Sequence, residues 1–274
     1  MSTVRETLKN AIPDSLKPAA RRWYDGLRRL PELPEAFFHP WRVDSIHRLR
    51  KYKDIHRGER CFIIGNGPSL KQLDLSLLKN EYTFGMNRIY MAFEEMGFST
   101  NYYVCMNDLV VEQCAEDIQK LDIPRFISWR ARKWVHLDEG IHYIYSTYTG
   151  PRFSTDMTGR VWESATVTFV ALQLAYYMGF ETVYLIGVDH NFVTQGTPNS
   201  TVVSQGDDPN HFNPGYFGKG FRWQLPDLET SEIGYRMARV AFEKDRRQVL
   251  DATLGGKLTV FPKVNYTDLF RQDG

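Results

Sequence analysis

The sequence has few cysteines and lacks long apolar runs. Its three cysteines, Cys61, Cys105 and Cys114, show no CxxC spacing, which argues against a disulfide framework or a zinc site and favours reduced thiols in a core. No apolar stretch approaches the roughly 20 residues that a membrane-spanning helix needs. The first residues also lack the basic-then-apolar pattern of a secretory signal. These absences predict a cytoplasmic protein.

The sequence also lacks a strong net charge, because 34 Lys and Arg oppose 33 Asp and Glu over 274 residues. The balance is uneven along the chain. Residues 1–58 hold 13 basic and 7 acidic residues, a net of +6, so that the remainder carries −5 against the total of +1. A basic excess confined to one end of an otherwise acidic chain argues against a nucleic-acid partner.

The basic segment is also rich in aromatic side chains. Trp23, Tyr24 and Trp41 alternate with arginines, and five prolines divide the segment into two or three short helices. Aromatic and basic residues together suit the interface of an anionic membrane, which would place the protein at the inner membrane surface. Packing of the same aromatics on the main domain or on a second subunit is the alternative. The sequence predicts a helical extension over 1–57 and a catalytic domain over 58–274.

The pattern of the second region is an alternation of short apolar strands and longer helices. Such alternation predicts a Rossmann-like α/β fold, with a mostly parallel sheet, helices on both of its faces and ligands at the carboxyl ends of the strands. The 42% of apolar residues suffices for a sizeable core. The predicted strands are 61–65, 82–86, 102–106, 125–128, 142–145, 182–187 and 248–251, and the predicted helices are 70–79, 110–121, 165–178 and 231–244.

Residues 190–230 form a long tract without a regular pattern, rich in Gly, Asn, Asp and Pro. Irregular segments of this length in compact domains are usually lids or binding loops. We therefore expect this tract to cover a binding site.

The first predicted strand runs into a glycine-bracketed turn. Gly65 and Gly67 allow a close approach to the main chain, and Ser69 with the amides of the following helix would face a phosphate or diphosphate. The spacing is neither the dinucleotide fingerprint nor the usual P-loop. A plain strand-to-helix turn is the alternative.

Asparagines stand at the ends of three strands. Asn66, Asn87 and Asn107 each follow an apolar run, and an amide offers both a donor and an acceptor for a base, a ribose or a phosphate. A single such residue is more often a turn residue or a helix cap. Together the three predict a nucleotide pocket.

A second polar cluster surrounds the later strand at 182–187. Thr166 and Thr168 open an apolar helix and could cap it or hold an anion. Asp189 follows the strand and could bind Mg²⁺, accept a ribose hydroxyl or cap a loop. His190 and His211, in the irregular tract, are candidate acids or bases at neutral pH.

These motifs, in this order, resemble two related families. The motifs are GNGPSL at 65–70, GMNR around Asn87, CMND around Asn107, and ALQLAYYMGF at 171–180 followed by YLIGVD at 184–189. One family is the MptE-like family, named for archaeal 6-hydroxymethylpterin diphosphokinases and widespread in bacterial surface-polysaccharide loci. The other comprises the bacterial lipooligosaccharide sialyltransferases. The resemblance covers roughly residues 58–270.

The sialyltransferase resemblance implies a CMP-sugar donor and no required cofactor. It assigns Asn66, Asn87 and Asn107 to the donor nucleotide and places Thr166 and Thr168 near a nucleotide-contacting position. His211 is the implied base, with His190 as the alternative because no histidine follows His211. Tyr216 or Arg222 would join the turn amides and Ser69 in stabilising the departing phosphate.

The expected function is therefore a glycosyltransferase of cell-surface polysaccharide or lipopolysaccharide synthesis. It would use a CMP-linked acidic, sialic-acid-like sugar and a glycan or glycolipid acceptor. In the diphosphokinase reading, Asp108 and Asp189 would instead hold Mg²⁺ against ATP. A non-catalytic nucleotide-binding scaffold is a third possibility.

Overall fold

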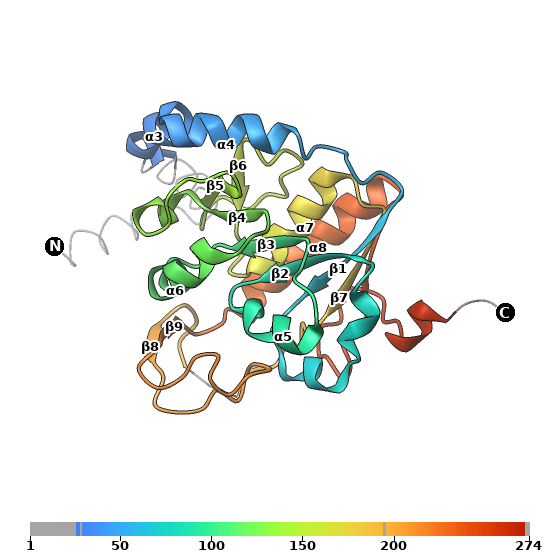
Figure 1. Ribbon diagram of the computed structural model, residues 1–274. Helices are drawn as coiled ribbons and strands as arrows, with labels where there is room; N and C mark the ends of the chain where they lie inside the picture. Colours follow the sequence, from blue (N-terminus) through green and yellow to red (C-terminus); the bar gives the residue numbers. More distant parts are fainter. Residues whose placement is uncertain (1–25, 28, 194–195, 272–274) are drawn as a thin grey trace, which may run out of the picture.

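The computed structural model describes residues 26–271, apart from residues 28 and 194–195 (Figure 1). Its centre is a sheet of eight strands in the order β10-β7-β1-β2-β3-β4-β5-β6, and every neighbouring pair is parallel. The predicted parallel sheet is confirmed. The strands are β1 Arg60–Ile64, β2 Tyr82–Met86, β3 Tyr102–Cys105, β4 Arg125–Ser128, β5 Ile141–Thr147, β6 Arg160–Trp162, β7 Thr182–Ile186 and β10 Gln248–Asp251.

Strand β1 shows why the sheet is apolar on both sides. Cys61 and Ile63 pack into one core cluster, whereas Phe62 and Ile64, pointing the other way, pack into a second. The first cluster includes side chains of two long helices, and the second includes those of a third. These helices are α7 Val167–Met178 and α8 Leu228–Lys244 on one face and α6 Asp108–Lys120 on the other. Helices on both faces of the sheet are therefore confirmed.

The strand order creates a switch point beside β1. From β1 the chain builds the sheet outward through β2 to β6, then returns through α7 to place β7 on the other side of β1. The turns that follow β1 and β7 therefore lie side by side at one edge of the sheet. A crevice at the carboxyl ends of two such strands is the usual ligand position in a doubly wound sheet.

One predicted helix is wrong. In place of a helix over 70–79 the chain forms two short 3-10 helices, η3 Pro68–Gln72 and η4 Leu75–Leu78. Leu73 between them is extended, and the Asp74 side chain accepts a hydrogen bond from Ser76 N, which starts the second helix anew. The break arises because a local side-chain cap at Asp74 competes with continuation of the helix. The other three predicted helices are present.

The irregular tract contains a small hairpin that the sequence pattern did not indicate. Strands β8 Thr201–Val203 and β9 Arg222–Gln224 pair antiparallel, separately from the main sheet. The hairpin is held to α6 by the Arg222–Glu112 ion pair and by two hydrogen bonds between the Gln113 side chain and the Arg222 backbone. The tract thus folds back beside α6, below the sheet in the view of Figure 1.

The described part of the N-terminal segment is packed on the sheet. Helix α4 Pro40–Arg50 lies along β5, following the short helices η2 Leu30–Glu32 and α3 Leu33–Phe38. Trp41 stacks on Tyr143, and Leu49 is fully buried in the core. For α4 the packing alternative therefore holds, although the division of the chain at residue 57 stays a prediction. Trp23 and Tyr24 lie outside the described residues.

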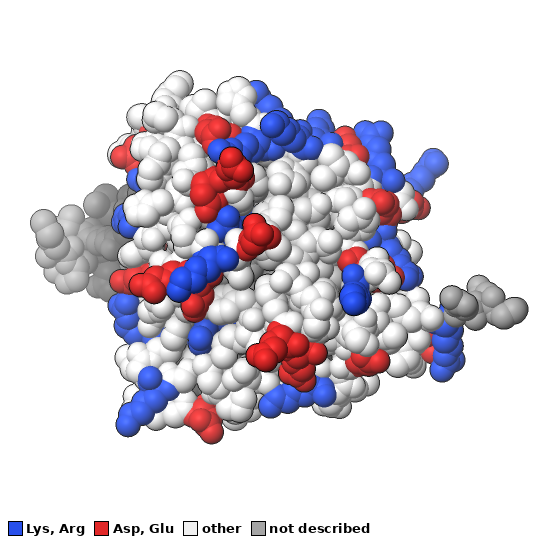
Figure 2. Space-filling model, in the orientation of Figure 1, with Lys and Arg blue, Asp and Glu red and all other residues white. Residues whose placement is uncertain are grey.

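Two further predictions concern the cysteines and membrane-spanning helices. All three cysteines are free and buried, as expected. Among the described helices, none has the length and apolar character to cross a membrane. On the face shown in Figure 2, acidic and basic side chains are interspersed.

A buried serine offers a test of how firmly α4 belongs to the fold. Ser45 is fully buried, accepts a hydrogen bond from Tyr143 N at 3.0 Å and donates one to Trp41 O at 2.9 Å. Ser45→Ala leaves the strand amide without its partner, which should lower the free energy of unfolding by about 1–3 kcal/mol. Urea denaturation measures this loss, with Ser204→Ala in the exposed loop as the control. An unchanged midpoint for Ser45→Ala would mean that α4 unfolds apart from the sheet.

Candidate functional site

Two adjoining pockets lie at the carboxyl ends of the central strands. The small pocket has a cavity of about 150 Å³ and is lined by residues including Asn66, Thr168 and Asp189. The large pocket has a cavity of about 530 Å³ and is lined by residues including Asn107 and Trp223. Both are lined by Ala165, Thr166, Val167, Phe192, His211 and Pro226. They therefore form one cleft at the predicted switch point.

The glycine turn after β1 lies directly against the turn after β7. A Cβ on Gly65 would lie 2.2 Å from Gly187 O, and one on Gly67 would lie 1.8 Å from Asp189 Oδ2. Gly65 N and Gly67 N both donate to backbone oxygens of this second turn, those of Ile186 and Gly187. The glycines are needed because backbone and carboxylate of the second turn occupy the space of a side chain.

The anion held by this turn is the chain's own Asp189. Ser69 donates to it from the backbone N at 3.2 Å and from Oγ at 2.7 Å. The Asp189 carboxylate thus occupies the position where the sequence suggested a phosphate. Burial raises the pKa of Asp189 above its ordinary value, although the hydrogen bonds from Ser69 act in the opposite direction. The phosphate-binding role of Gly65, Gly67 and Ser69 stays a prediction, and Ser69 would have to leave Asp189 to fulfil it.

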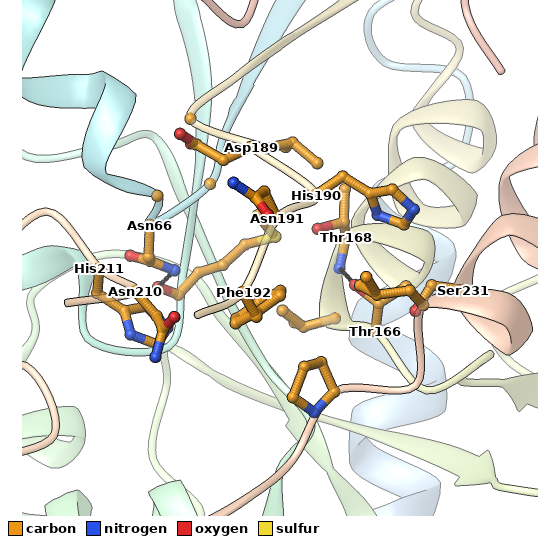
Figure 3. A pocket seen from close by; sticks show the side chains of 18 of the residues that line it. Asn66, Thr166, Thr168, Asp189, His190, Asn191, Phe192, Asn210, His211 and Ser231 are labelled. Atoms are coloured by element: carbon orange, nitrogen blue, oxygen red, sulfur yellow. Dashed lines mark hydrogen bonds between the residues drawn. The ribbon is translucent and has the colours of Figure 1, made fainter. Parts of the chain in front are cut away.

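Asn66 lines the small pocket and has an unsatisfied acceptor. Its side chain is largely buried, and its Nδ2 donates to Met86 O at 3.1 Å. Its Oδ1 is buried and has no hydrogen-bond partner among the described residues. Figure 3 shows Asn66 beside His211 on one side of the cavity, with Thr166, Thr168 and Ser231 on the other. A ligand with a hydrogen-bond donor would satisfy this oxygen.

The other two asparagines line the large pocket. Asn87 follows β2 in a left-handed conformation, with φ of 50°, and its Oδ1 accepts a weak hydrogen bond from the Cys105 thiol. Asn107 caps α6, because its Oδ1 accepts from the N–H groups of Leu109 and Val110. Its Nδ2 donates to Gln224 Oε1 at 3.4 Å, a long bond that a ligand could replace. The structure therefore brings the three asparagines to one cleft but divides them between its two pockets.

The N-terminus of α7 lies between the pockets. Thr166 is its N-cap, since its side chain accepts from Thr168 N at 3.3 Å, so the capping alternative holds for this residue. Ser164 and Ala165, just before it, both have a positive φ, 48° and 56°. This conformation turns the chain sharply into the helix. The helix dipole gives this point of the cleft a positive potential.

His211 forms a dyad that the motifs did not reveal. Its Nδ1 lies 2.7 Å from Asp208 Oδ2, and Asp208 is further held by the backbone N–H groups of Asn210 and Phe217. The ring stacks on Tyr216 with centroids 4.0 Å apart. Because a carboxylate can only accept a hydrogen bond, the Nδ1 atom of His211 carries the proton, and its Nε2 atom is left to act as a base. Asp208 could have been noticed only from its position three residues before His211.

The remaining predicted residues have other surroundings. Tyr216 is fully buried, accepts a hydrogen bond from Arg88 N and supports His211 rather than lining either pocket. His190 lines the small pocket, with its Nε2 3.2 Å from Glu232 Oε1.

Asp108 pairs with Arg130 at 3.0 Å and lines neither of the two pockets. Arg130 also binds Glu163 and Tyr148. Burial by itself lowers the pKa of Arg130, but Glu163, Tyr148 and Asp108 outweigh burial and raise it above its ordinary value.

Asp108 and Asp189, the carboxylates that would hold Mg²⁺ in the diphosphokinase hypothesis, are each engaged by another side chain. One carboxylate is bound by Arg130 and the other by Ser69, and the described residues contain no group of three or more His, Cys, Asp or Glu side chains placed to hold a metal ion. Because Mg²⁺ is usually held by one or two carboxylates together with substrate phosphates, the magnesium role of these two residues stays a prediction.

Comparisons with known proteins identify a family. The model of the family described as 6-hydroxymethylpterin diphosphokinase MptE-like matches residues 40–195, more than half of the chain. No curated protein matches the sequence. Among solved structures, a MAf glycosyltransferase from Magnetospirillum magneticum AMB-1 is similar, with a TM-score of 0.49 and 14% identity. The alignment covers 96% of this chain and 43% of that one, so the chain spans less than half the length of that protein.

The raised pKa of Asp189 makes a prediction about stability and pH. The folded chain binds this proton more tightly than the unfolded chain, whose pKa is near 3.8. The contribution of Asp189 to the free energy of unfolding is therefore greatest below that pH and falls as pH rises through the folded-state pKa. The side chain of the Asp189→Asn variant cannot ionise. The free energy of unfolding of the wild type minus that of Asp189→Asn, measured by urea denaturation, should therefore fall from pH 3.5 to pH 7.

Asp227 supplies the matched control. Hydrogen bonds from Thr230 and Asn199 lower its pKa despite the opposing effect of partial burial. The difference between wild type and Asp227→Asn should therefore rise with pH over the same range. Equal slopes for the two variants would contradict the assigned surroundings of Asp189.

Proposed function

The chain belongs to the MptE-like family, and on that premise we propose that it is a glycosyltransferase that moves a sugar from a nucleotide-activated donor to an acceptor hydroxyl. The observation that carries the proposal is the His211–Asp208 dyad at the junction of the two pockets, across the cavity from the N-terminus of α7. A base and a positive helix end that face the same cavity are the groups that such a displacement requires.

The small pocket supports binding of the nucleotide. Asn66 Oδ1 is a buried acceptor that awaits a donor, such as an exocyclic amine or a ribose hydroxyl. The N-terminus of α7, at Thr166 and Thr168, lines this pocket, and the positive end of the helix dipole there favours a phosphate. On the motif resemblance to the sialyltransferases, we propose more specifically that the nucleotide is CMP and that the transferred group is an acidic sugar.

His211 is the proposed base. Asp208 holds the Nδ1 proton and the stacked Tyr216 fixes the plane of the ring, so Nε2 can accept the proton of an acceptor hydroxyl. In a direct displacement the acceptor oxygen forms a bond to the anomeric carbon while the bond from that carbon to the phosphate oxygen breaks. The proton moves to Nε2, and the nucleotide leaves as an anion stabilised by the α7 N-terminus. His190, which lies against Glu232, is the alternative base.

The family description favours a second candidate, a Mg²⁺-dependent transfer of diphosphate from ATP to a pterin-like alcohol. It would use Asp108 and Asp189, whose carboxylates are engaged by Arg130 and Ser69. A non-catalytic scaffold that binds nucleotide without turnover is the third candidate. A single ligand panel separates the three.

The first experiment is a thermal-shift panel of CMP, CDP, UDP, GDP, ADP and ATP, each with and without Mg²⁺. A ligand that binds only the folded chain raises Tm, by about 2.7 kcal/mol of added stability at one hundred times its Kd. We expect CMP to stabilise the protein without metal, because Asn66 and α7 need no ion to bind it. A shift seen only with ATP and Mg²⁺ would replace the transferase by the diphosphokinase.

Variants of the His211–Asp208 dyad separate nucleotide binding, measured by the thermal shift, from the rate of sugar transfer. His211→Ala should keep the nucleotide shift but lose about 10²–10⁴-fold of the transfer rate from any donor that the panel identifies. Asp208→Asn should retain an intermediate rate, and exposed His136→Ala serves as the control. A full transfer rate in His211→Ala, together with a lost transfer rate in His190→Gln, would make His190 the base in place of His211. Nucleotide binding without turnover of any donor would favour the scaffold.

Attachment to an anionic membrane is a separate proposal, supported by exposed apolar side chains beside arginines. Leu30 and Phe38 are 53% and 79% exposed on the segment that precedes α4. Replacing both by Ser should weaken co-sedimentation of the full chain with anionic vesicles by at least about tenfold, because full burial of one such side chain contributes about 1.5–3 kcal/mol and a tenfold change corresponds to about 1.4 kcal/mol. Val240→Ser on α8, 65% exposed, is the control. Equal binding by both variants would rule out this surface.

A further inference from the structure

The large pocket has a lining that suits a sugar ring. Its cavity of about 530 Å³ lies within the usual range for ligand sites. Aromatic and neutral amide side chains predominate among its polar and ring-bearing residues. Amides donate and accept in equal measure, as hydroxyl groups do, and aromatic rings cover the apolar C–H faces of a ligand. The amides of this lining and its aromatic residues with a polar atom are Asn87, Asn107, Asn199, Gln224, Tyr148 and Trp223.

The charges of this lining are negative. Glu163 and Asp227 both line the large pocket, whereas no described lysine or arginine does. The nearest counter-charge, Arg130, is shared between Glu163 and Asp108, with distances of 2.7 and 3.0 Å. Arg130 therefore neutralises at most one of two carboxylates and has little charge left for a ligand.

The positive element at the cleft is the N-terminus of α7. It lies where the two pockets meet, at Thr166 and Val167. A helix end is equivalent to roughly half a positive charge, enough to favour one anionic group. In the proposed function the phosphate of the nucleotide takes this position. A second anion in the large pocket would then face Glu163 and Asp227 without a partner.

From this charge distribution we infer that the large pocket is a subsite for an uncharged, hydroxyl-rich sugar. The inference rests on the proposed function and departs from the acidic sugar that the sialyltransferase resemblance implies. His211 and the N-terminus of α7 both line the two pockets, so a sugar in the large pocket lies in the same cleft as the base and the proposed phosphate position. The sugar is either the one carried by the donor or the one that ends the acceptor glycan, and both share this chemistry.

The test is saturation-transfer NMR on the full chain, with lactose as the neutral probe and sialyllactose as the matched acidic probe. Each is measured alone and in the presence of saturating CMP. We expect signals from lactose that persist with CMP, and signals from sialyllactose at least about fivefold weaker, on the scale of one unfavourable charge pair. Displacement of lactose by a complete nucleotide sugar, but not by its nucleotide alone, assigns the subsite to the donor. Persistence of lactose with that nucleotide sugar bound assigns it to the acceptor.

Two variants connect the result to the lining. Asp227→Asn keeps a residue that can cap α8 but removes one negative charge, so it should raise the binding of sialyllactose relative to that of lactose several-fold. Gln224→Ala removes an exposed amide of the lining and should weaken lactose binding. Asp122 lines neither pocket of the cleft, so Asp122→Asn is the control and should change the binding of neither sugar.

The outcomes separate this inference from the proposed function. Equal binding of both probes, or tighter binding of sialyllactose, overturns the uncharged subsite even if CMP binds. Absence of any sugar signal, with and without CMP, overturns it as well. Failure of every nucleotide in the thermal-shift panel contradicts the proposed function instead, whereas binding of lactose in that case would leave the subsite in place.

Discussion

The close contact between the turns after β1 and β7 is the constraint on which the cleft depends. Gly65 and Gly67 bring the first turn against Gly187 and Asp189 at distances that exclude any side chain. Ser69 then binds the Asp189 carboxylate, which fastens the two turns together at the switch point. Because this contact sets where β1 and β7 end, it also sets where Asn66 and His190 enter the small pocket. A sequence that reads as a phosphate cradle has here a structural use, in which the carboxylate of the same chain supplies the anion.

The chemistry of the cleft is divided along its length. The small pocket combines a buried free acceptor on Asn66 with the positive end of α7, which favours a polar anionic group such as a nucleotide. The large pocket combines amides and aromatics with Glu163 and Asp227. His211 stands at the junction, oriented by Asp208 and by the Tyr216 ring. In the proposed function, the base stands between the part that takes the anionic nucleotide and the part that takes an uncharged sugar.

Local pattern predicted much of the fold. The limits of the seven predicted strands agree with the structure to within about two residues, because most are short apolar runs that end at a Gly, an Asn or a polar residue. The helix predicted over 70–79 failed because Asp74 caps a new turn, and such local competition leaves no trace in hydrophobic periodicity. β6 and the β8–β9 hairpin were missed because each strand is only three residues long. The asparagines were correctly placed at strand ends, yet their division between two pockets depends on the loops that cover them.

By itself the sequence determined most of the longer elements, their parallel arrangement and the family, since strand and helix periods and an ordered set of motifs are local properties of a chain. Only the tertiary structure decided which groups meet. Asp208 became the partner of His211, Asp189 the occupant of the glycine turn, and Arg130 the partner of Asp108 and Glu163 through contacts between loops. Such pairings arise from the relative positions of strand ends and irregular segments in space. No periodic pattern records those positions, so the charge and shape of the cleft could be known only once the chain was folded.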